Sequence, residues 1–361
     1  MESWRSTFAA PVGVTIARKM NGFRGLGLSL SNEDPVADTL AVVAAADRLG
    51  FEEVSLPESR LFNSVMPVAA AALHSTQRVT VRIGVANPVF RNPVLLALEA
   101  ATLADIGPGR LRFGLGAAEW TVRRFGMDPP GWRPLTNTVE AVRAVRRLTA
   151  GEELDFVPTT FSVAPGLRLD RFPPVPVPVD VGAVSRRMME VSGEFADGVQ
   201  LGAITSVGYT RWARDRLAAG AARAGRSVDD LLLSANVLTS VGPDRREARN
   251  AVKEVLAYYL ARVEGVVVDE AGADPDAVAA VRAAVAEGGE QAGAAVVSDS
   301  LVDVFGVAGT PDDVIEGLKP FADAGLDLPL AWYTFGPDRD AGIRLLAEQV
   351  RPAVVGADGV G

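Results

Sequence analysis

Two carboxylates, Glu58 and Glu119, each follow a short apolar run of the sequence, and residues of this type in this position can transfer protons. A carboxylate held at the end of a buried strand can accept or supply a proton during a reaction. Glu58 could also anchor a ring N–H, or it could simply begin a helix, where the helix dipole favours a negative charge. We therefore consider Glu119 and Glu58 as candidate catalytic residues.

The stretch IGVANPVFRNP, residues 83–93, has the apolar residues of a buried strand but also contains glycine, asparagine and two prolines. Gly84 lacks a Cβ, so the backbone there can approach a flat ligand closely. Asn87 can donate and accept hydrogen bonds at once. A turn into the following helix would explain the same residues, and the residue types alone favour the turn over a ligand site.

Glycines also interrupt the stretch GLGAAEW, residues 114–120. Gly114 and Gly116 alternate with apolar residues, a pattern that indicates close approach of another backbone to a strand. The third glycine of a dinucleotide-binding fingerprint is missing. The motif therefore does not predict a Rossmann-type nucleotide site.

A further glycine begins the segment GAVSRR, residues 182–187, which leads into a predicted helix. Unpaired backbone N–H groups at the start of a helix suit a phosphate group. Two arginines in the first turn are unfavourable to the helix dipole unless an anion binds beside them, although on a solvated surface turn they need no ligand. We expect a phosphate site formed by Gly182, Ala183, Val184, Ser185, Arg186 and Arg187.

The composition argues against several other classes of site. The chain of 361 residues has no cysteine and one histidine, so a thiolate metal cluster is excluded and a histidine-rich zinc site nearly so. The histidine, His74, lies near the end of a predicted helix and is expected at the surface. The formal charge of −9 argues against a nucleic-acid partner. No apolar run approaches the roughly 18 residues of a membrane span, and we expect a cytoplasmic protein without a metal that acts on a small molecule.

Eight apolar segments with the length of strands alternate with amphipathic helices along the chain. The predicted strands lie within residues 23–31, 51–59, 79–88, 110–120, 175–183, 199–205, 231–242 and 328–335. The predicted helices lie within residues 35–50, 66–77, 92–107, 131–151, 185–198, 208–225, 310–325 and 339–354. Adjacent parallel strands require helical crossovers, and eight such units close a barrel. We predict an α/β fold, a (β/α)8 TIM barrel, in a single domain over residues 1–361.

Two interruptions of this alternation, at residues 120–175 and 245–306, are interpreted as insertions on the barrel. The first is expected to include a short hairpin at residues 152–170, and the second contains helical runs and a glycine-rich patch. Loops after the strands build the active site of such a barrel. The candidate residues above should therefore gather at one end, where the insertions would select the substrate.

Four segments, in their order and spacing, resemble the bacterial luciferase-like superfamily of flavin and deazaflavin oxidoreductases. The segments are GVANPVFRNP, LEAATLADIGPGRLRFGLGAAEW, PVPVDVGAVSRRMMEVSGEFADGV and GTPDDVIEGLKPFADAG. Within this superfamily, the segments GVANPVFRNP and GLGAAEW are most similar to the methylenetetrahydromethanopterin reductase branch. The resemblance covers roughly residues 23–350.

The resemblance implies a non-prolyl cis peptide bond at Gly84–Val85 that supports a flavin ring from behind. Glu119 matches an acidic position that lies near the reacting ring in relatives. Many relatives carry an aspartate–histidine pair where this chain has glutamate and serine, so Glu58 or Glu119 would have to transfer the proton. Besides the phosphate segment, the expected cofactor contacts are Ser55, Gly84, Val85, Ala86, Asn87, Gly114 and Gly116.

The resemblance further implies an oxidoreductase that uses coenzyme F420, a deazaflavin, to transfer a hydride to or from a small organic substrate. The anionic tail of this coenzyme needs cations, which Arg123, Arg124, Arg186 and Arg187 could supply. An FMN-dependent monooxygenase is the alternative and would need only the phosphate site. A non-catalytic flavin-binding protein is a third hypothesis. Relatives often dimerise, so a homodimer is expected.

Overall fold

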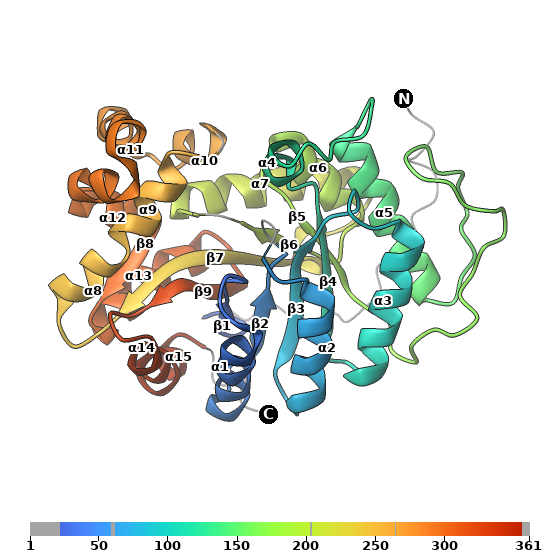
Figure 1. Ribbon diagram of the computed structural model, residues 1–361, viewed down its shortest axis with the longest axis horizontal. Coiled ribbons are helices and arrows are strands. Elements are labelled where there is room, and N and C mark those ends of the chain that lie inside the picture. Colours follow the sequence, from blue (N-terminus) through green and yellow to red (C-terminus); the bar gives the residue numbers. More distant parts are fainter. Residues whose placement is uncertain (1–21, 59–61, 203, 264, 356–361) are drawn as a thin grey trace.

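The computed structural model describes residues 22–58, 62–202, 204–263 and 265–355. Within them, eight parallel strands form a closed barrel surrounded by helices (Figure 1). The strands of the barrel are β1 (Gly27–Ser29), β2 (Glu53–Leu56), β3 (Thr80–Ala86), β4 (Leu111–Gly116), β5 (Val179–Gly182), β6 (Gly198–Leu201), β7 (Leu232–Val241) and β9 (Leu328–Phe335). The predicted (β/α)8 barrel and the positions of its eight strands are confirmed.

The ring closes because β1 pairs with both β2 and β9, while β7 pairs with both β6 and β9. β7 is longer than its neighbours, and its residues 238–241 pair with a further short strand, β8 (Gly306–Gly309). The sequence analysis missed β8, which has only four residues and lies at the end of an insertion.

Helices cover the outside of the barrel and connect its strands. At the predicted positions lie α1 (Val36–Leu49), α2 (Val65–Ser75), α3 (Pro93–Ile106), α5 (Pro134–Thr149), α6 (Arg186–Phe195), α7 (Val207–Arg223), α13 (Pro311–Asp323) and α14 (Arg339–Leu345). A 3-10 turn, Val228–Asp230, precedes β7, and a π-helical turn, Leu346–Val350, joins α14 to α15 (Arg351–Val354). His74 is exposed in the last turn of α2, as predicted. None of the described helices is long and apolar enough to cross a membrane.

A buried charge cluster fills the barrel near the amino-terminal ends of its strands. Arg82 pairs with Glu53 and Asp180, and Arg112 Nε donates to the same Asp180 carboxylate at 2.9 Å. Buried charges require such opposite partners, because a lone charge would lose its hydration without compensation. A small apolar cluster lies in the same level of the strands: Leu232, Leu328 and Leu330. A cavity is present toward the carboxyl-terminal ends of the strands.

The predicted hairpin at residues 152–170 is wrong, because the chain has no strand there. One backbone hydrogen bond, from Leu154 N to Leu167 O at 3.2 Å, connects the two sides of the loop. Glu140 of α5 accepts hydrogen bonds from the backbone N–H and hydroxyl groups of both Thr159 and Thr160. The Glu140 carboxylate therefore accepts hydrogen bonds from backbone N–H groups that would pair with a neighbouring strand in a hairpin.

The insertion at residues 245–306 is mostly helical, in agreement with its alanine- and valine-rich runs. It contains α8 (Arg245–Ala251), α9 (Lys253–Leu260), α10 (Gly265–Asp269), α11 (Pro275–Val296) and α12 (Asp299–Phe305). The glycine-rich patch lies inside α11, where Gly289 has a φ of 77° and kinks the helix. Figure 1 shows these helices grouped beside the barrel, at the left of the view.

Candidate active site

A cavity of about 450 Å³ opens at the carboxyl-terminal ends of the barrel strands. Its lining combines the ends of strands with α4 (Glu119–Arg124), α6 and the insertion helices α9 and α10. A cavity of this size suits a small molecule or a cofactor. The predicted site residues that line it are Gly84, Val85, Gly116, Glu119, Gly182, Ala183, Val184 and Ser185.

The third strand is interrupted at the cavity, where the peptide bond between Gly84 and Val85 is cis, as predicted. The pairing of β3 with β4 shifts its register at this point. Directly afterwards Asn92 caps α3, its side chain accepting a hydrogen bond from Val94 N at 2.9 Å. The stretch at residues 83–93 therefore forms both a bulge that faces the cavity and a turn that leads into α3.

Ala86 and Asn87 fix the bulge from behind, outside the cavity lining. Ala86 is buried and returns to the ladder opposite Leu115. Asn87 Nδ2 donates to Ala117 O at 2.6 Å, and its Oδ1 accepts from Val89 N at 2.7 Å. The bond to Ala117 joins the end of β3 to the segment after β4, so the two segments together form one continuous wall of the cavity.

Glycines on β4 and β5 make room for the side chain of Val85. A Cβ added at Gly116 would lie 2.6 Å from one methyl carbon of Val85, and one added at Gly182 would lie 3.0 Å from the other. A Cβ at Gly114 would lie 2.3 Å from the carbonyl oxygen of Ile83. Gly114 thus serves the packing of the bulge from outside the cavity lining, whereas Gly116 and Gly182 also form part of the wall.

A polar group lies beneath Gly84, inside the barrel. Gln200 Nε2 donates to Ser55 Oγ at 3.3 Å and to Asn236 Oδ1 at 3.1 Å. Gln200 Oε1 is buried and has no hydrogen-bond partner among the described residues. Gln200 and Asn236 line the cavity, and Ser55 is fully buried behind them. A buried acceptor without a partner calls for an explanation, and a donor group on a ligand provides one.

Glu119 begins α4 at the cavity wall. The preceding Ala118 has a φ of 41°, in the left-handed region, and turns the chain from β4 into the helix. The Glu119 side chain is half exposed, and its Oε2 accepts from Arg123 Nη2 at 3.3 Å. Arg124 lies over the ring of Trp120, 5.0 Å from its centre. A carboxylate in this position can exchange protons with both a bound molecule and water.

Residues 182–185, which lead into α6, form the next part of the wall. Ser185 caps the helix, its hydroxyl accepting from Met188 N at 3.4 Å. The carbonyl oxygen of Val184 accepts from the hydroxyl group of Tyr209 at 3.0 Å. Backbone N–H groups of a first helical turn have no intrahelical partners, so this end of α6 can bind an anion.

The two arginines of the α6 start are exposed and lie outside the cavity lining. Arg186 Nε donates to Glu190 Oε1 at 2.8 Å, and the next residue, Arg187, is also exposed. The hydrogen bond from Arg186, together with nearby guanidinium charges, holds the pKa of Glu190 below its ordinary value. Arg186 is thus partly neutralised by its own helix.

Glu58 lies outside the cavity lining, in an ion pair with Arg91. Arg91 Nη2 donates to Glu58 Oε1 at 2.6 Å, and the Glu58 side chain is 9% exposed. The hydrogen bond that Arg91 donates to Glu58 raises the pKa of Arg91, so the guanidinium group stays charged. The structure therefore does not bring the two candidate carboxylates together.

Another wall of the cavity is aromatic, and the sequence analysis missed it. Trp332 and Tyr333 lie in the second half of β9, and Tyr258 and Tyr259 belong to α9 in the insertion. The Tyr259 and Trp332 rings meet edge to face with centres 4.8 Å apart. The available signal was local: an aromatic pair at the end of the last strand and another inside the insertion.

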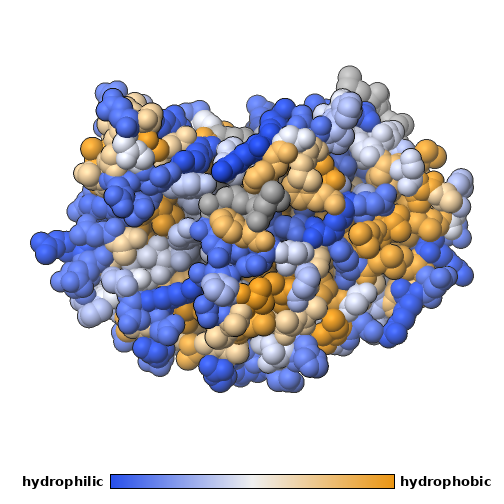
Figure 2. All heavy atoms as spheres, viewed as in Figure 1, coloured by the Kyte–Doolittle hydropathy of each residue, from blue (hydrophilic) through white to orange (hydrophobic). Residues whose placement is uncertain are grey.

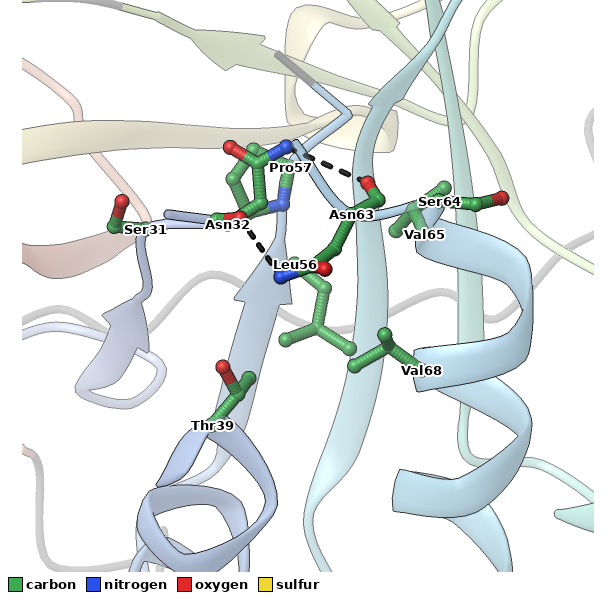
Figure 3. Close-up of a pocket in the computed structure, with 9 residues that line it drawn as sticks. All are labelled: Ser31, Asn32, Thr39, Leu56, Pro57, Asn63, Ser64, Val65 and Val68. Atoms are coloured by element: carbon green, nitrogen blue, oxygen red, sulfur yellow. Dashed lines mark hydrogen bonds between the residues drawn. The ribbon is translucent and has the colours of Figure 1, made fainter. Parts of the chain in front are cut away.

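A pair of asparagines connects the loops after β1 and β2 beside the cavity (Figure 3). Asn63 Nδ2 donates to Asn32 O at 3.0 Å and to Asp34 O at 2.8 Å. The small pocket between the loops has about 10 Å³, room for one water molecule. Ser31 and Pro57 line both this pocket and the main cavity, so the asparagines position part of its wall.

A closed parallel barrel with a ligand-sized cavity at the carboxyl ends of its strands has the arrangement of TIM-barrel enzymes. The family model of luciferase-like monooxygenases matches residues 21–328 of this sequence. The chain belongs to this family.

Three comparisons describe its relatives. The sequence is 32% identical to a 5,10-methylenetetrahydromethanopterin reductase of Archaeoglobus fulgidus, over 86% of this chain and 93% of that protein. It is 28% identical to an F420-dependent glucose-6-phosphate dehydrogenase of Beutenbergia cavernae, over 87% of this chain and 92% of that protein. The structure of the F420-dependent tetrahydromethanopterin reductase of Methanopyrus kandleri superposes with a TM-score of 0.84 at 24% identity, over 91% of this chain and 99% of that one.

Proposed function

We propose that this chain is a coenzyme F420-dependent oxidoreductase that transfers a hydride between the deazaflavin and a small organic substrate. The relatives named as a reductase and as an F420-dependent dehydrogenase support this class of reaction. One observation carries the proposal: the bulge at Gly84 and Val85 forms a cavity wall directly above the unpartnered oxygen of Gln200.

The residues of this wall fit a flat ring with polar edges. Gly84 offers backbone without a side chain, and a ring N–H would satisfy Gln200 Oε1. The start of α6 at Ser185 suits a phosphate group on the tail of the cofactor. The exposed arginines of α4 and α6 provide positive charge near the rim for an acidic tail: Arg123, Arg124, Arg186 and Arg187.

When bound, the deazaflavin supplies hydride transfer, which requires that the donor and acceptor carbons be held in contact. Glu119 would hold or accept the proton at the reacting group of the substrate, because its carboxylate lines the cavity. Glu58 is held by Arg91 outside the lining, so we assign the proton to Glu119 alone. The aromatic residues of β9 and α9 would exclude water from the contact.

Absorbance titration of the purified protein with each cofactor tests this proposal. We expect saturable binding of F420 and much weaker binding of FMN. Tight FMN binding without F420 binding would contradict the proposal and favour an FMN-dependent monooxygenase. Binding of F420 without turnover of any reducible or oxidisable substrate would favour the non-catalytic alternative.

A further inference from the structure

Four aromatic side chains form a continuous surface along one side of the cavity. From Tyr258 through Tyr259 and Trp332 to Tyr333, the ring centres follow one another at 5.0, 4.8 and 5.5 Å. Each successive pair meets edge to face, and all four residues line the cavity. We call these four residues the aromatic wall. Such a surface favours a flat ring, because aromatic pairs contribute beyond the area they bury.

The charged residues of the described cavity lining are Glu33, Glu119 and Arg262. Arg262 is already engaged: its Nη2 donates to Glu290 Oε1 at 2.8 Å and its Nη1 donates to Tyr258 O at 2.8 Å. Its guanidinium carbon also lies 3.9 Å from the centre of the Tyr258 ring. Glu290 belongs to α11 and lies outside the cavity lining.

Two of these three charges already have partners, because Glu119 Oε2 accepts from Arg123 Nη2 and Arg262 donates to Glu290. A substrate carboxylate or phosphate near the aromatic wall would lose its hydration, and it would have to displace Glu290 to pair with Arg262, the cation of the described lining. An uncharged ring loses little hydration and gains the contacts of the aromatic wall. The arginines near the rim lie outside the lining, where they serve the proposed cofactor tail.

We propose that the substrate of this site is an uncharged molecule with a flat ring that packs on the aromatic wall, and that phosphorylated sugars and other anions are disfavoured. The inference rests on the proposed function, because it names the substrate class of the same site. Tyr259 is one of the two central members of the wall, since it contacts both Tyr258 and Trp332. It is a specificity residue in this proposal.

Calorimetric titration of the protein with three matched probes tests the inference. The probes are 2-acetylnaphthalene, which is flat and neutral, its 6-carboxylate, which is flat and anionic, and 2-acetyldecahydronaphthalene, which is neutral but not flat. We expect 2-acetylnaphthalene to bind about tenfold more tightly than either of the others, with oxidised F420 present so that binding alone is measured. Glucose 6-phosphate should show no saturable binding.

Substitutions separate the aromatic contribution from the charge contribution. Tyr259→Leu should weaken binding of 2-acetylnaphthalene about fivefold, because an aromatic pair contributes roughly 0.5–1.5 kcal/mol. Tyr259→Phe keeps the aromatic ring and should retain the affinity for 2-acetylnaphthalene. If Tyr259 acted only through a structural role of its hydroxyl group, this variant would lose affinity as well. Trp212→Leu is the matched control, because Trp212 stacks on Tyr209 outside the cavity lining.

Glu290→Gln tests the charge argument directly. It releases Arg262 from its carboxylate partner, so binding of the 6-carboxylate probe should strengthen at least about threefold while 2-acetylnaphthalene is unaffected. Glu287→Gln removes the same charge from the same helix without removing the bond to Arg262 and should change neither affinity.

The outcomes distinguish this inference from the proposed function. If F420 does not bind in the absorbance titration, the proposed function fails. If F420 binds but the anionic and neutral probes bind equally, or the flat and saturated probes bind equally, the substrate inference alone is wrong. An unchanged affinity of Tyr259→Leu for 2-acetylnaphthalene would equally overturn the role of the aromatic wall.

Discussion

One side chain, that of Val85, accounts for glycines on two neighbouring strands. Its methyl groups occupy the space that a Cβ would fill at Gly116 and Gly182. The side chain of Val85 can therefore pack against both β4 and β5 without displacing either strand. This packing leaves the Gly84 backbone and Gln200 Oε1 at the cavity, where a ring can meet both.

Replacing Gln200 by leucine should weaken cofactor binding. The substitution removes the unpartnered acceptor, and one hydrogen bond of this kind contributes roughly 0.5–1.5 kcal/mol, a loss of up to about tenfold in affinity. Absorbance titration with F420 measures the change, and Gln77→Leu, at an exposed position, is the control. Equal affinities for the wild type and Gln200→Leu would mean that this oxygen does not contact the cofactor.

Glu119→Gln should slow turnover without altering cofactor affinity. A glutamine has nearly the same shape but cannot take the proton, and general acid–base catalysis contributes roughly 10²–10⁴-fold to a rate. Steady-state kcat and the F420 titration measure the two effects separately. Full activity of Glu119→Gln would exclude the proposed proton transfer, and Glu58→Gln, outside the cavity lining, would then be the next variant to assay.

At the scale of elements, the position of the α6 start depends on how closely α6 and α7 pack. Glycines allow this approach: a Cβ at Gly220 would lie 1.8 Å from the carbonyl oxygen of Glu190, and one at Gly193 would lie 2.3 Å from that of Leu217. Both contacts involve backbone, which cannot turn aside as a flexible side chain can. The close contact between α6 and α7 therefore fixes the position of the start of α6 at the cavity.

Gly220→Ala should consequently lower both stability and cofactor affinity. Overpacking of this kind costs roughly 1–3 kcal/mol of unfolding free energy and shifts α6. Urea denaturation and F420 titration provide the two readouts, with Ala219→Ser on the exposed face of α7 as the control. Wild-type values in both measurements would show that the helix contact has no such role.

Asp47 at the end of α1 holds the start of β3. Its carboxylate accepts from the backbone N–H groups of Gln77, Arg78 and Val79 at 3.2, 2.8 and 2.8 Å. Partial burial opposes ionisation, but these hydrogen bonds outweigh it and hold the pKa of Asp47 below the ordinary 3.8. The carboxylate therefore stabilises the fold above about pH 4.

Asp47→Ala should lower the unfolding free energy by about 2 kcal/mol at pH 7, since hydrogen bonds to a charged group are lost. The folded protein holds its proton less tightly than the unfolded chain. The difference between variant and wild type should thus stay constant from pH 7 down to the unfolded pKa of 3.8 and shrink as pH falls through the lower folded value. Urea denaturation at several pH values measures it, with exposed Asp215→Ala as the control. A difference that grew toward low pH would contradict this account.

At the scale of the whole molecule, the homodimer remains a prediction, and we propose that the outer face of α3 forms its interface. Leu95 and Leu98 are 46% and 47% exposed there, and Ile106 follows farther along the helix at 38%. Figure 2 shows apolar surface gathered over this side of the molecule, at the right of the view. Apolar patches of this kind commonly mark protein–protein contacts.

Sedimentation velocity should therefore find a dimer that the double variant Leu95→Glu and Leu98→Glu converts to a monomer. Charges placed in a buried apolar interface lose their hydration without a partner. Val157→Glu, at a residue that is 89% exposed in the loop after α5, should leave the dimer intact. A wild-type protein that sediments as a monomer would rule out this interface.

Local patterns predicted the barrel because each strand and helix has its own apolar period, which a single sequence displays. They failed at residues 152–170, where Glu140 replaces a strand partner, since that contact has no local pattern. The cavity was only partly predictable for the same reason. Its glycine-rich segments could be recognised in the sequence. The role of Gln200 could not, because it depends on hydrogen bonds to Ser55 and Asn236, which lie far away in the sequence.

The most direct test of the account is a crystal structure of the protein with F420. We predict that the deazaflavin ring lies against Gly84 and Val85 with a ring N–H within hydrogen-bond distance of Gln200 Oε1, and that the phosphate of the cofactor meets the start of α6 at Ser185. A ring bound elsewhere, with the wall at Gly84 and Val85 left in contact with solvent, would contradict the central claim.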